Sequence, residues 1–224
     1  MMKILNLVVS VLFVFSFYHV NAQLQNYNSR RHDLDQKLMV GLGSWASLNL
    51  IGSGVGLANT NNDEHRSFHQ MNIIWNTVNL GLAIPGYIKA RRSSSELSLF
   101  ETFSQQQKTE IGFIFNAGLD LVYMSSGLIF KSEGKTNQDK SMMYNGFGNS
   151  LIIQGGFLFV FDLIAFGIHR SRSKKELWSL IDEYPDMVML CSDDKHPNDL
   201  AVGHINKLAQ RAIAKGCDIY NVLR

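Results

Sequence analysis

The stretch IGFIFNAGLDLVYMSSGL, Ile111–Leu128, decides the fold of this 224-residue chain. It is apolar almost throughout, and extended to Phe130 it is long enough to cross a hydrocarbon layer of ~30 Å as a helix. It also carries Asn116, Asp120 and Tyr123 at helical spacing, so these three side chains share one face. An ionised aspartate at the bilayer centre costs at least ~2.5–3.5 kcal/mol on insertion scales. This face is therefore expected to lie inside a bundle of helices.

Three further segments resemble this stretch in length and apolar character. Leu38–Ala58 is rich in Gly and Ser, whereas Met71–Ile88 and Ser150–Ile168 both end at basic clusters. The four segments hold 18–21 residues each, and a segment of this length in hydrocarbon is helical because a helix satisfies its own backbone hydrogen bonds. The sequence predicts an all-α integral membrane protein with four transmembrane helices. The alternative is a soluble domain with four buried helices.

The first and third segments are related by an internal repeat. Val40–Leu57 aligns with Ile111–Leu128 at an offset of 71 residues, with six identities in eighteen positions. In this alignment Asn49 meets Asp120. The simplest explanation is a duplicated helical hairpin, residues 38–92 and 109–174, in the same orientation, as in some transporter folds. Convergence between two Gly-rich membrane helices is the alternative.

Polar side chains recur on one face of each segment. In the second, His65, His69, Asn72, Asn76 and Asn79 step by four and three residues. The candidate intramembrane polar residues are Asn49, Asn72, Asn76, Asn79, Asn116, Asp120, Tyr123, Gln154, Asp162 and His169. Two roles are open for them: an interhelical hydrogen-bond network that fixes helix register, or the lining of a small cavity for a proton, an ion or a solute.

Packing and metal motifs are sparse. Gly52 and Gly56 form a small-xxx-small pair, which predicts close helix packing. His65 and His69 have the i, i+4 spacing of metal ligands, but no third ligand is evident, so we expect no metal and no cofactor. The two cysteines of the chain provide neither a zinc spacing nor a disulfide framework.

The composition narrows the class of partner. Charged residues make up only 18% of the chain and the net charge is +2, and no basic helix interleaved with aromatic residues occurs, which argues against nucleic acid. The expected partner is the lipid bilayer of a bacterial cell membrane, the inner membrane. Homo-oligomerisation is left open, because four helices leave little room for a pore.

The N-terminus has the features of a signal peptide at residues 1–22. Lys3 precedes the apolar run Ile4–Tyr18, and Val20 and Ala22 suit the −3 and −1 sites of cleavage before Gln23. The alternative is an uncleaved fifth helix. Residues 23–37 are polar and are expected to form a solvated lead-in, and residues 93–108 are expected to form a linker.

The orientation in the membrane depends on this choice. The lead-in, the linker and the end of the fourth segment carry eleven flanking Lys and Arg, against four on the other side. Cleavage would place the eleven outside, contrary to the positive-inside rule, whereas a retained fifth helix would place them inside. Residues 23–174 also loosely resemble small uncharacterised bacterial membrane proteins with paired hairpins.

The last fifty residues differ in character from the rest. Met187–Cys191 is a short apolar run typical of a buried strand, an acidic turn follows, and His204–Lys215 is amphipathic and ends at Gly216. A strand, a turn and a helix correspond to one βα unit of an α/β barrel, in which catalytic groups lie at the C-terminal strand ends. Residues 175–224 are therefore expected to form a short α/β or helical appendage.

This tail resembles a segment of bacterial adenine deaminase, of the amidohydrolase superfamily. The resemblance covers residues 176–224 and rests on LCSDDKHPNDL at 190–200 and GHINKLAQRAIAKG at 203–216. It implies deamination of adenine to hypoxanthine by a metal-activated hydroxide, with Asp193 or Asp194 as the ligand and proton carrier and His196 beside them. The other histidine and acidic ligands of the family have no counterparts in this chain. We therefore expect a vestigial, inactive fragment, and an integral membrane protein that is not an enzyme as it stands.

Overall fold

The computed structural model describes the backbone of residues 2–179 and the side chains of residues 21–179. Within residues 2–179 every regular element is helical and no strand occurs. The elements are α1 (Met2–Asn59), α2 (Asp63–Arg92), α3 (Leu99–Thr136), the 3₁₀ turn η1 (Gln138–Lys140), α4 (Ser141–Arg172) and the π-helical turn η2 (Ser173–Leu177). The predicted strand Met187–Cys191, the helix His204–Lys215 and residues Asp193, Asp194 and His196 lie outside the described residues.

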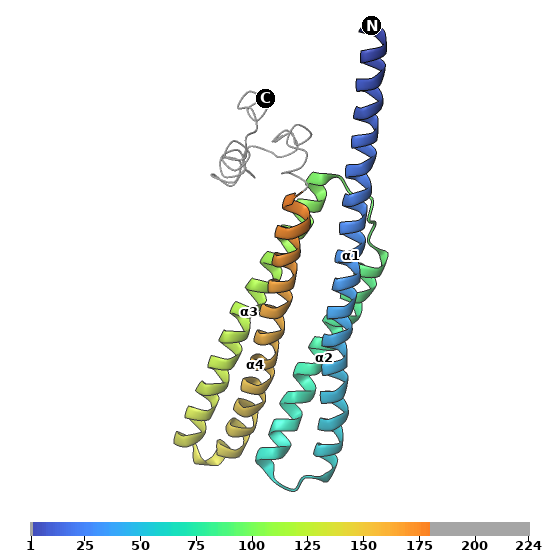
Figure 1. Cartoon of the computed structure of the whole chain (residues 1–224). Helices are drawn as coiled ribbons and strands as arrows, with labels where there is room; N and C mark the ends of the chain where they lie inside the picture. The colour runs from blue at the N-terminus through green and yellow to red at the C-terminus, as the bar shows by residue number, and fades with distance from the viewer. Residues whose placement is uncertain (1, 180–224) are drawn as a thin grey trace, which may run out of the picture. The chain divides into compact units, whose positions relative to one another are not determined.

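The four long helices form two antiparallel hairpins, α1–α2 and α3–α4, whose turns lie at the same end (Figure 1). The first turn ends at Asn62, whose side chain accepts a hydrogen bond from the backbone N–H of His65 and so caps α2. The second turn is held by Asn137, which caps η1 through the N–H of Lys140. Residues 1–170 form one compact unit, and every contact described below lies within it.

Glycines allow the helices to approach closely. A Cβ added at Gly127 of α3 would lie 2.7 Å from the carbonyl oxygen of Gly148 of α4, and one at Gly146 would lie 2.3 Å from that of Glu64 of α2. Gly56 packs in the same way against the ring of His69. Gly52 was predicted to pack together with Gly56, but among the described residues nothing lies within 4 Å of its Cβ position. Of the predicted pair, only Gly56 therefore faces a neighbouring helix within the chain, and Gly52 does not.

The regions next to the predicted membrane segments are more helical than the sequence predicted. Residues 23–37, expected to be a solvated lead-in, continue α1 without a break, and Leu24, Tyr27 and Asn28 are buried there. The expected linker of residues 93–108 is also mostly helical, because α3 begins at Leu99. A capping box between Ser98 and Glu101 starts that helix: Ser98 Oγ accepts from the N–H of Glu101, and the Glu101 carboxylate accepts from the N–H of Ser98.

Among the described residues, three helical stretches are long and apolar enough to cross a membrane: Asn21–Asn59, Leu99–Thr136 and Gln138–Leu177. The sequence predicted four, and the missing one is α2. Its average apolarity is reduced by the polar residues that it carries on one side, Asn72, Asn76 and Asn79. All three are buried, so the polarity of α2 is turned into the bundle and its outer face is apolar.

The apolar core of the bundle is small. Leu42 of α1, Ala83 of α2 and Leu158 of α4 form one buried cluster, with Trp75, Phe157 and Phe161 packed against it. Many large apolar side chains are exposed, and the fully buried positions are occupied largely by small and polar residues.

Candidate functional site

Side-chain amides from three helices meet inside the bundle. Asn49 Oδ1 of α1 accepts hydrogen bonds from Asn72 Nδ2 of α2 at 3.0 Å and from Gln154 Nε2 of α4 at 3.1 Å. Gln154 Nε2 also donates to Asn72 Oδ1, and Asn72 Nδ2 also donates to Ser53 Oγ at 2.7 Å. We call Asn49, Asn72 and Gln154 the amide cluster. These hydrogen bonds connect α1, α2 and α4. Each of them forms only when its two residues lie at the same level along the neighbouring helices.

Two stacked aromatic side chains, Trp45 and Phe157, lie next to the amide cluster. Trp45 Nε1 donates to Gln154 Oε1 at 2.9 Å, and the Trp45 ring stacks on Phe157 with centroids 3.7 Å apart and an angle of 6° between the planes. Asn72 and Gln154 are almost completely buried. The amide cluster was assembled from residues that the sequence singled out, whereas Trp45 and Ser53 were missed. Their helical spacing of four residues on either side of Asn49 is the signal that could have found them.

The two remaining asparagines of α2 face the interior but are less well satisfied. Asn76 Nδ2 donates to the backbone carbonyl of Asn72 at 2.8 Å, while Asn76 Oδ1 has no hydrogen-bond partner among the described residues. The Nδ2 of Asn79 and the Nε1 of Trp75 are also buried there without a partner. Buried polar atoms without a partner are rare in native structures.

Two carboxyl groups interact directly on the other side of the bundle. Asp120 of α3 and Asp162 of α4 are 3% and 7% exposed, and their side chains are within hydrogen-bonding reach of each other. Asp120 Oδ2 is buried without a hydrogen-bond partner in the described part of the chain. Two buried carboxylates this close repel each other, so ionisation of both groups of this acid pair at once is disfavoured.

The other residues of α3 that the sequence grouped with Asp120 separate in the structure. Tyr123 turns inward, where its ring packs edge-on against Trp75 with centroids 4.5 Å apart. Asn116 is exposed on the outside of the bundle. The shared face predicted for Asn116, Asp120 and Tyr123 therefore holds only for the last two, because a step of four residues advances slightly more than one helical turn and Asn116 lies at the margin of the buried face.

His169 lies in a second polar region near the end of α4. It is 1% exposed, its Nε2 lies 3.1 Å from Asp35 Oδ1, and its ring stacks on Phe113. Gln106 Nε2 donates to the backbone carbonyl of His169 and to Glu110 Oε1. Glu110 in turn pairs with Arg170 at 2.9 Å. His169 was expected to be one of the intramembrane polar residues, but its contacts come from the lead-in and from α3.

The lead-in and the short connection after α2 are joined by a further set of hydrogen bonds. Asn28 Nδ2 donates to Thr102 Oγ1 at 2.8 Å, and Arg31 donates to Gln105 Oε1 at 2.6 Å. His32 Nε2 lies 3.0 Å from the carbonyl oxygen of Ser94. These contacts were not predicted, because polar residues outside an apolar segment are usually exposed to water. The signal was the regular spacing of Asn28, Arg31 and Asp35 on one helix face.

The histidines of α2 do not form a metal site in the described residues. His69 lies against Gly56, whereas His65 is exposed at the start of the helix. Within residues 2–179 no group of three or more His, Cys, Asp or Glu side chains is placed to hold a metal ion.

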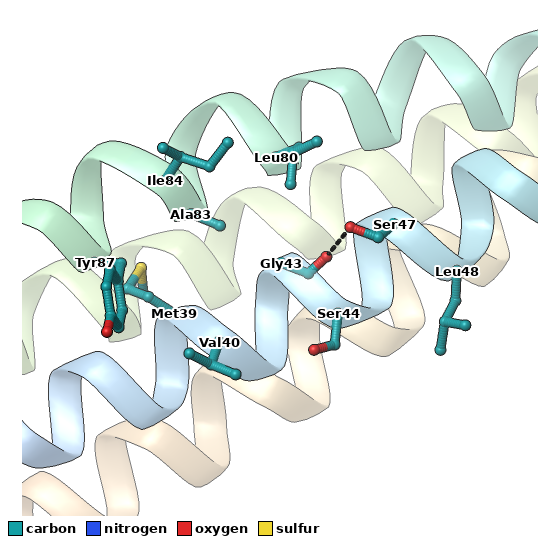
Figure 2. Close-up of a pocket in the computed structure, with 10 residues that line it drawn as sticks. All are labelled: Met39, Val40, Gly43, Ser44, Ser47, Leu48, Leu80, Ala83, Ile84 and Tyr87. Atoms are coloured by element: carbon teal, nitrogen blue, oxygen red, sulfur yellow. Dashed lines mark hydrogen bonds between the residues drawn. The ribbon is translucent and has the colours of Figure 1, made fainter.

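A groove of about 630 Å³ runs along the outer face of the first hairpin (Figure 2). It is lined by Met39, Val40, Gly43, Ser44, Ser47 and Leu48 of α1 and by Leu80, Ala83, Ile84 and Tyr87 of α2. The Cβ position of Gly43 lies 3.6 Å from the Cβ of Ala83, and the hydroxyl of Ser47 is bonded to the carbonyl of Gly43 at 2.8 Å. Most of the residues that line the groove have apolar side chains. Met39 and Tyr87 lie together at one end (Figure 2).

Comparison with known proteins gives two results, one from a family model and one from curated relatives. Residues 41–163, more than half of the chain, match the model of a family described as "Family of unknown function (DUF6992)". The chain belongs to this family. The matched range includes the amide cluster, the acid pair and the groove lining from Gly43 to Tyr87, but not Met39, Val40, His169 or the lead-in. No solved structure matches the chain significantly.

Curated relatives match a smaller part of the chain. An adenine deaminase of Methanosarcina mazei is 56% identical over 55 residues, which are 24% of this chain and 10% of that enzyme. One of Salinibacter ruber is 55% identical over 49 residues, and one of Borreliella afzelii is 36% identical over 110 residues. The chain thus spans about a tenth to a fifth of the length of these relatives. The resemblance of part of the chain to adenine deaminase is confirmed.

Proposed function

We propose that this protein is an integral membrane bundle of four helices, not an enzyme as it stands, in which buried amides fix how the helices align. The observation that carries this proposal is the inverted distribution of polarity. Large apolar side chains such as Ile51 (66% exposed) and Ile129 (67%) face outward, while Gln154 and Asn76 are fully buried. A water-soluble protein rarely exposes a continuous apolar surface of this kind, whereas a lipid-facing surface requires one.

The position of the exposed apolar residues also supports membrane insertion. On α1 they run from Val40 to Val55, on α2 from Ile74 to Ile88, on α3 from Ile111 to Ile129 and on α4 from Ile153 to Ile168. Stretches of about 15–19 helical residues are ~22–28 Å long, close to the hydrocarbon thickness. We therefore include α2 as the fourth span, since Val78 and Leu82 face outward and its asparagines face inward.

The close contacts inside the two hairpins support a duplication, which is part of the proposal. Gly56 and Gly127 are equivalent in the internal repeat at an offset of 71 residues. Gly56 faces His69 of its own hairpin, and Gly127 faces Gly148 of its own. His69 and Gly148 are 79 residues apart, the same offset that relates Ile73 and Ile74 to Ile152 and Ile153. Each of the two equivalent glycines thus faces the second helix of its own hairpin.

The amide cluster has the properties of a structural element. Asn49, Asn72 and Gln154 use most of their hydrogen-bonding groups on one another, so little capacity remains for a ligand. In a membrane the hydrophobic effect does not hold helices together, and side-chain hydrogen bonds and close packing take its place. The acid pair is different, because one of its carboxylate oxygens is unpartnered. Binding of a proton at Asp120 and Asp162 is therefore the candidate activity of the bundle.

A second candidate function is suggested by the resemblance of residues 176–224 to adenine deaminase. The relatives named adenine deaminase motivate it, and their activity would convert adenine to hypoxanthine and ammonia. The tail holds one segment of such an enzyme without the ligands that a metal-activated hydroxide needs, so we propose that the tail is catalytically inert. We further propose a location in the bacterial inner membrane, with residues 1–22 acting as a signal peptide or as a retained helix.

Extraction and topology mapping test the main proposal. The full-length protein should stay in the membrane pellet after washing with alkaline carbonate. Reporters fused after residues 60 and 140 should fall on one side of the membrane, and reporters after residues 100 and 176 on the other. Release into the soluble fraction, or the same side for all four reporters, would falsify membrane insertion as four spans.

A further inference from the structure

We propose that the groove between α1 and α2 binds an anionic phospholipid of the surrounding bilayer, with one acyl chain along its apolar lining and the phosphate group at its basic end, between Arg91 and Lys37. The inference rests on the proposed membrane insertion. It goes beyond it by assigning a specific lipid site to one face of one hairpin.

The groove has the length of one leaflet. Its lining on α1 extends from Met39 to Leu48, and its lining on α2 from Leu80 to Tyr87. Ten helical residues rise by about 14 Å, and half of a hydrocarbon layer of ~30 Å is about 15 Å. A volume of about 630 Å³ along this length suits a flexible chain rather than a compact solute.

The groove face becomes basic where the apolar lining ends. Arg91 follows Tyr87 by four residues on α2, and Lys37 precedes Val40 by three residues on α1, so both continue the face that lines the groove. The contact of Gly86 with Met39 fixes the alignment of the two helices and brings these residues within about one helical turn of the same level. Tyr87 lies at this end, where an aromatic side chain with a hydroxyl is suited to the interface (Figure 2).

The charges at this end select an anion. Lys89, Arg91 and Arg92 are exposed, and the sequence from Ile84 to Ser95 contains no acidic residue. Lys37 pairs with Asp33 at 2.6 Å, but both side chains are more than half exposed, and an ion pair of this kind is easily exchanged for a phosphate. Arginine binds phosphate through two parallel N–H groups, and juxtamembrane basic residues attract anionic lipid. A zwitterionic headgroup of the same size gains less, because its own cation opposes these charges.

Native mass spectrometry of the full-length protein, released from nanodiscs of defined composition, tests the assignment. Discs of phosphatidylglycerol should yield protein that retains one lipid, at least tenfold more often than discs of phosphatidylcholine. The variant K37Q/R91Q should lower phosphatidylglycerol retention roughly tenfold, because two of the charges that attract an anionic headgroup are removed. The matched control K135Q/K140Q removes two exposed charges at the other end of the bundle and should retain the lipid like the wild type.

A second variant tests the apolar part. Ser44→Leu fills the groove from an exposed position, so folding should be preserved and retention of both lipids should fall. Glycerol phosphate and inorganic phosphate serve as probes without acyl chains and should not compete at millimolar concentration. Three results with lipids would each overturn the proposal: equal retention of both lipids, unchanged retention in K37Q/R91Q, or competition by inorganic phosphate. A disulfide-linked dimer of Ser44→Cys would also overturn it, because a second copy of the chain would then cover the groove. Membrane insertion is judged separately, by carbonate washing of the same protein.

Discussion

Gln154 on α4 donates a side-chain hydrogen bond to Oδ1 of Asn72 on α2, and both side chains also bond to Asn49 on α1. Three helices are thereby connected at one level by groups that cannot slide past one another without losing their partners. Large apolar side chains are exposed on all four helices, so in the proposed bilayer these hydrogen bonds would have the role that a hydrophobic core has in a soluble protein.

Replacing Gln154 by Leu should therefore destabilise the bundle. The substitution keeps the size of the side chain but leaves Trp45 Nε1 without its acceptor and removes one donor each from Asn49 and Asn72. Measured losses of this kind in membrane proteins average ~0.6 kcal/mol per interaction, so a loss of roughly 1–2 kcal/mol is expected. Unfolding by denaturant in detergent micelles measures it. Asn116→Leu, at an exposed position of α3, is the control and should change stability little.

The acid pair should tolerate an amide but not an apolar group. Asp120→Asn keeps a hydrogen-bonding partner for Asp162 and removes the contact between two acids, so abundance and thermal stability should be preserved or increased. Asp120→Leu leaves Asp162 buried without that partner and should lower stability by roughly 1–3 kcal/mol.

Asp120→Asn also separates the two roles of the polar interior. Loss of a proton- or ion-linked activity at unchanged abundance would show that the acid pair binds a ligand. Retention of every measurable activity would leave only its role in packing.

Two glycines of α3 should respond oppositely to alanine. A Cβ at Gly127 would lie 2.7 Å from the backbone carbonyl of Gly148, which cannot move without separating the hairpin, so Gly127→Ala should cost about 1–3 kcal/mol. At Gly118 nothing lies within 4 Å of the added atom among the described residues. Gly118→Ala should therefore stabilise the helix by up to about 1 kcal/mol. The midpoint of thermal unfolding compares the two, and equal shifts would show that α3 and α4 are not in close contact.

The hydrogen bonds of the lead-in should protect the connection between α2 and α3. Asn28→Ala removes the donors to Thr102 and to the carbonyl of Ser95, so residues 93–98 should open more often. Trypsin cleavage after Arg91 and Arg92 should then be several times faster than in the wild type. Asn26→Ala changes an exposed side chain two residues away and should leave the rate unchanged. If both variants are cleaved at the wild-type rate, the packing of residues 23–37 against α3 is not maintained in solution.

The tail should show no deaminase activity. Purified protein supplied with Mn²⁺ or Fe²⁺ and adenine should release no more ammonia than a buffer blank, because the chain offers only one of the ligand groups that the resemblance implies. A clear release of ammonia that is lost in Asp193→Ala would contradict the inert assignment and give the tail a catalytic role.

Much of the bundle could be predicted from the pattern of apolar and polar residues. The helices and the inward asparagines of α2 follow from a period of 3.6 residues and from the cost of polar groups in lipid. The edges of the buried helix faces were predicted less well from the sequence. It predicted Asn116 to face inward and Gly52 to pack, because a face wide enough to include both is compatible with the spacing, and only the contacts show where the buried face ends.

The polar flanks show the same limit more clearly. Asn28, Arg31 and His32 read as solvated because they lie outside a span, and their partners are about 60–75 residues further along the chain. Nothing local distinguishes an arginine that faces water from one that binds Gln105.

The sequence by itself predicted four long helices with polar stripes, and a resemblance of the last fifty residues to part of adenine deaminase. It also showed that Ile111–Leu128 and Val40–Leu57 are alike, with Asp120 opposite Asn49. Only the tertiary structure decided that these two residues have different partners: Asn49 bonds to amides of α2 and α4, and Asp120 lies against Asp162. The physical reason is that local spacing selects the face a side chain occupies, whereas its partner depends on how far neighbouring helices are shifted along one another.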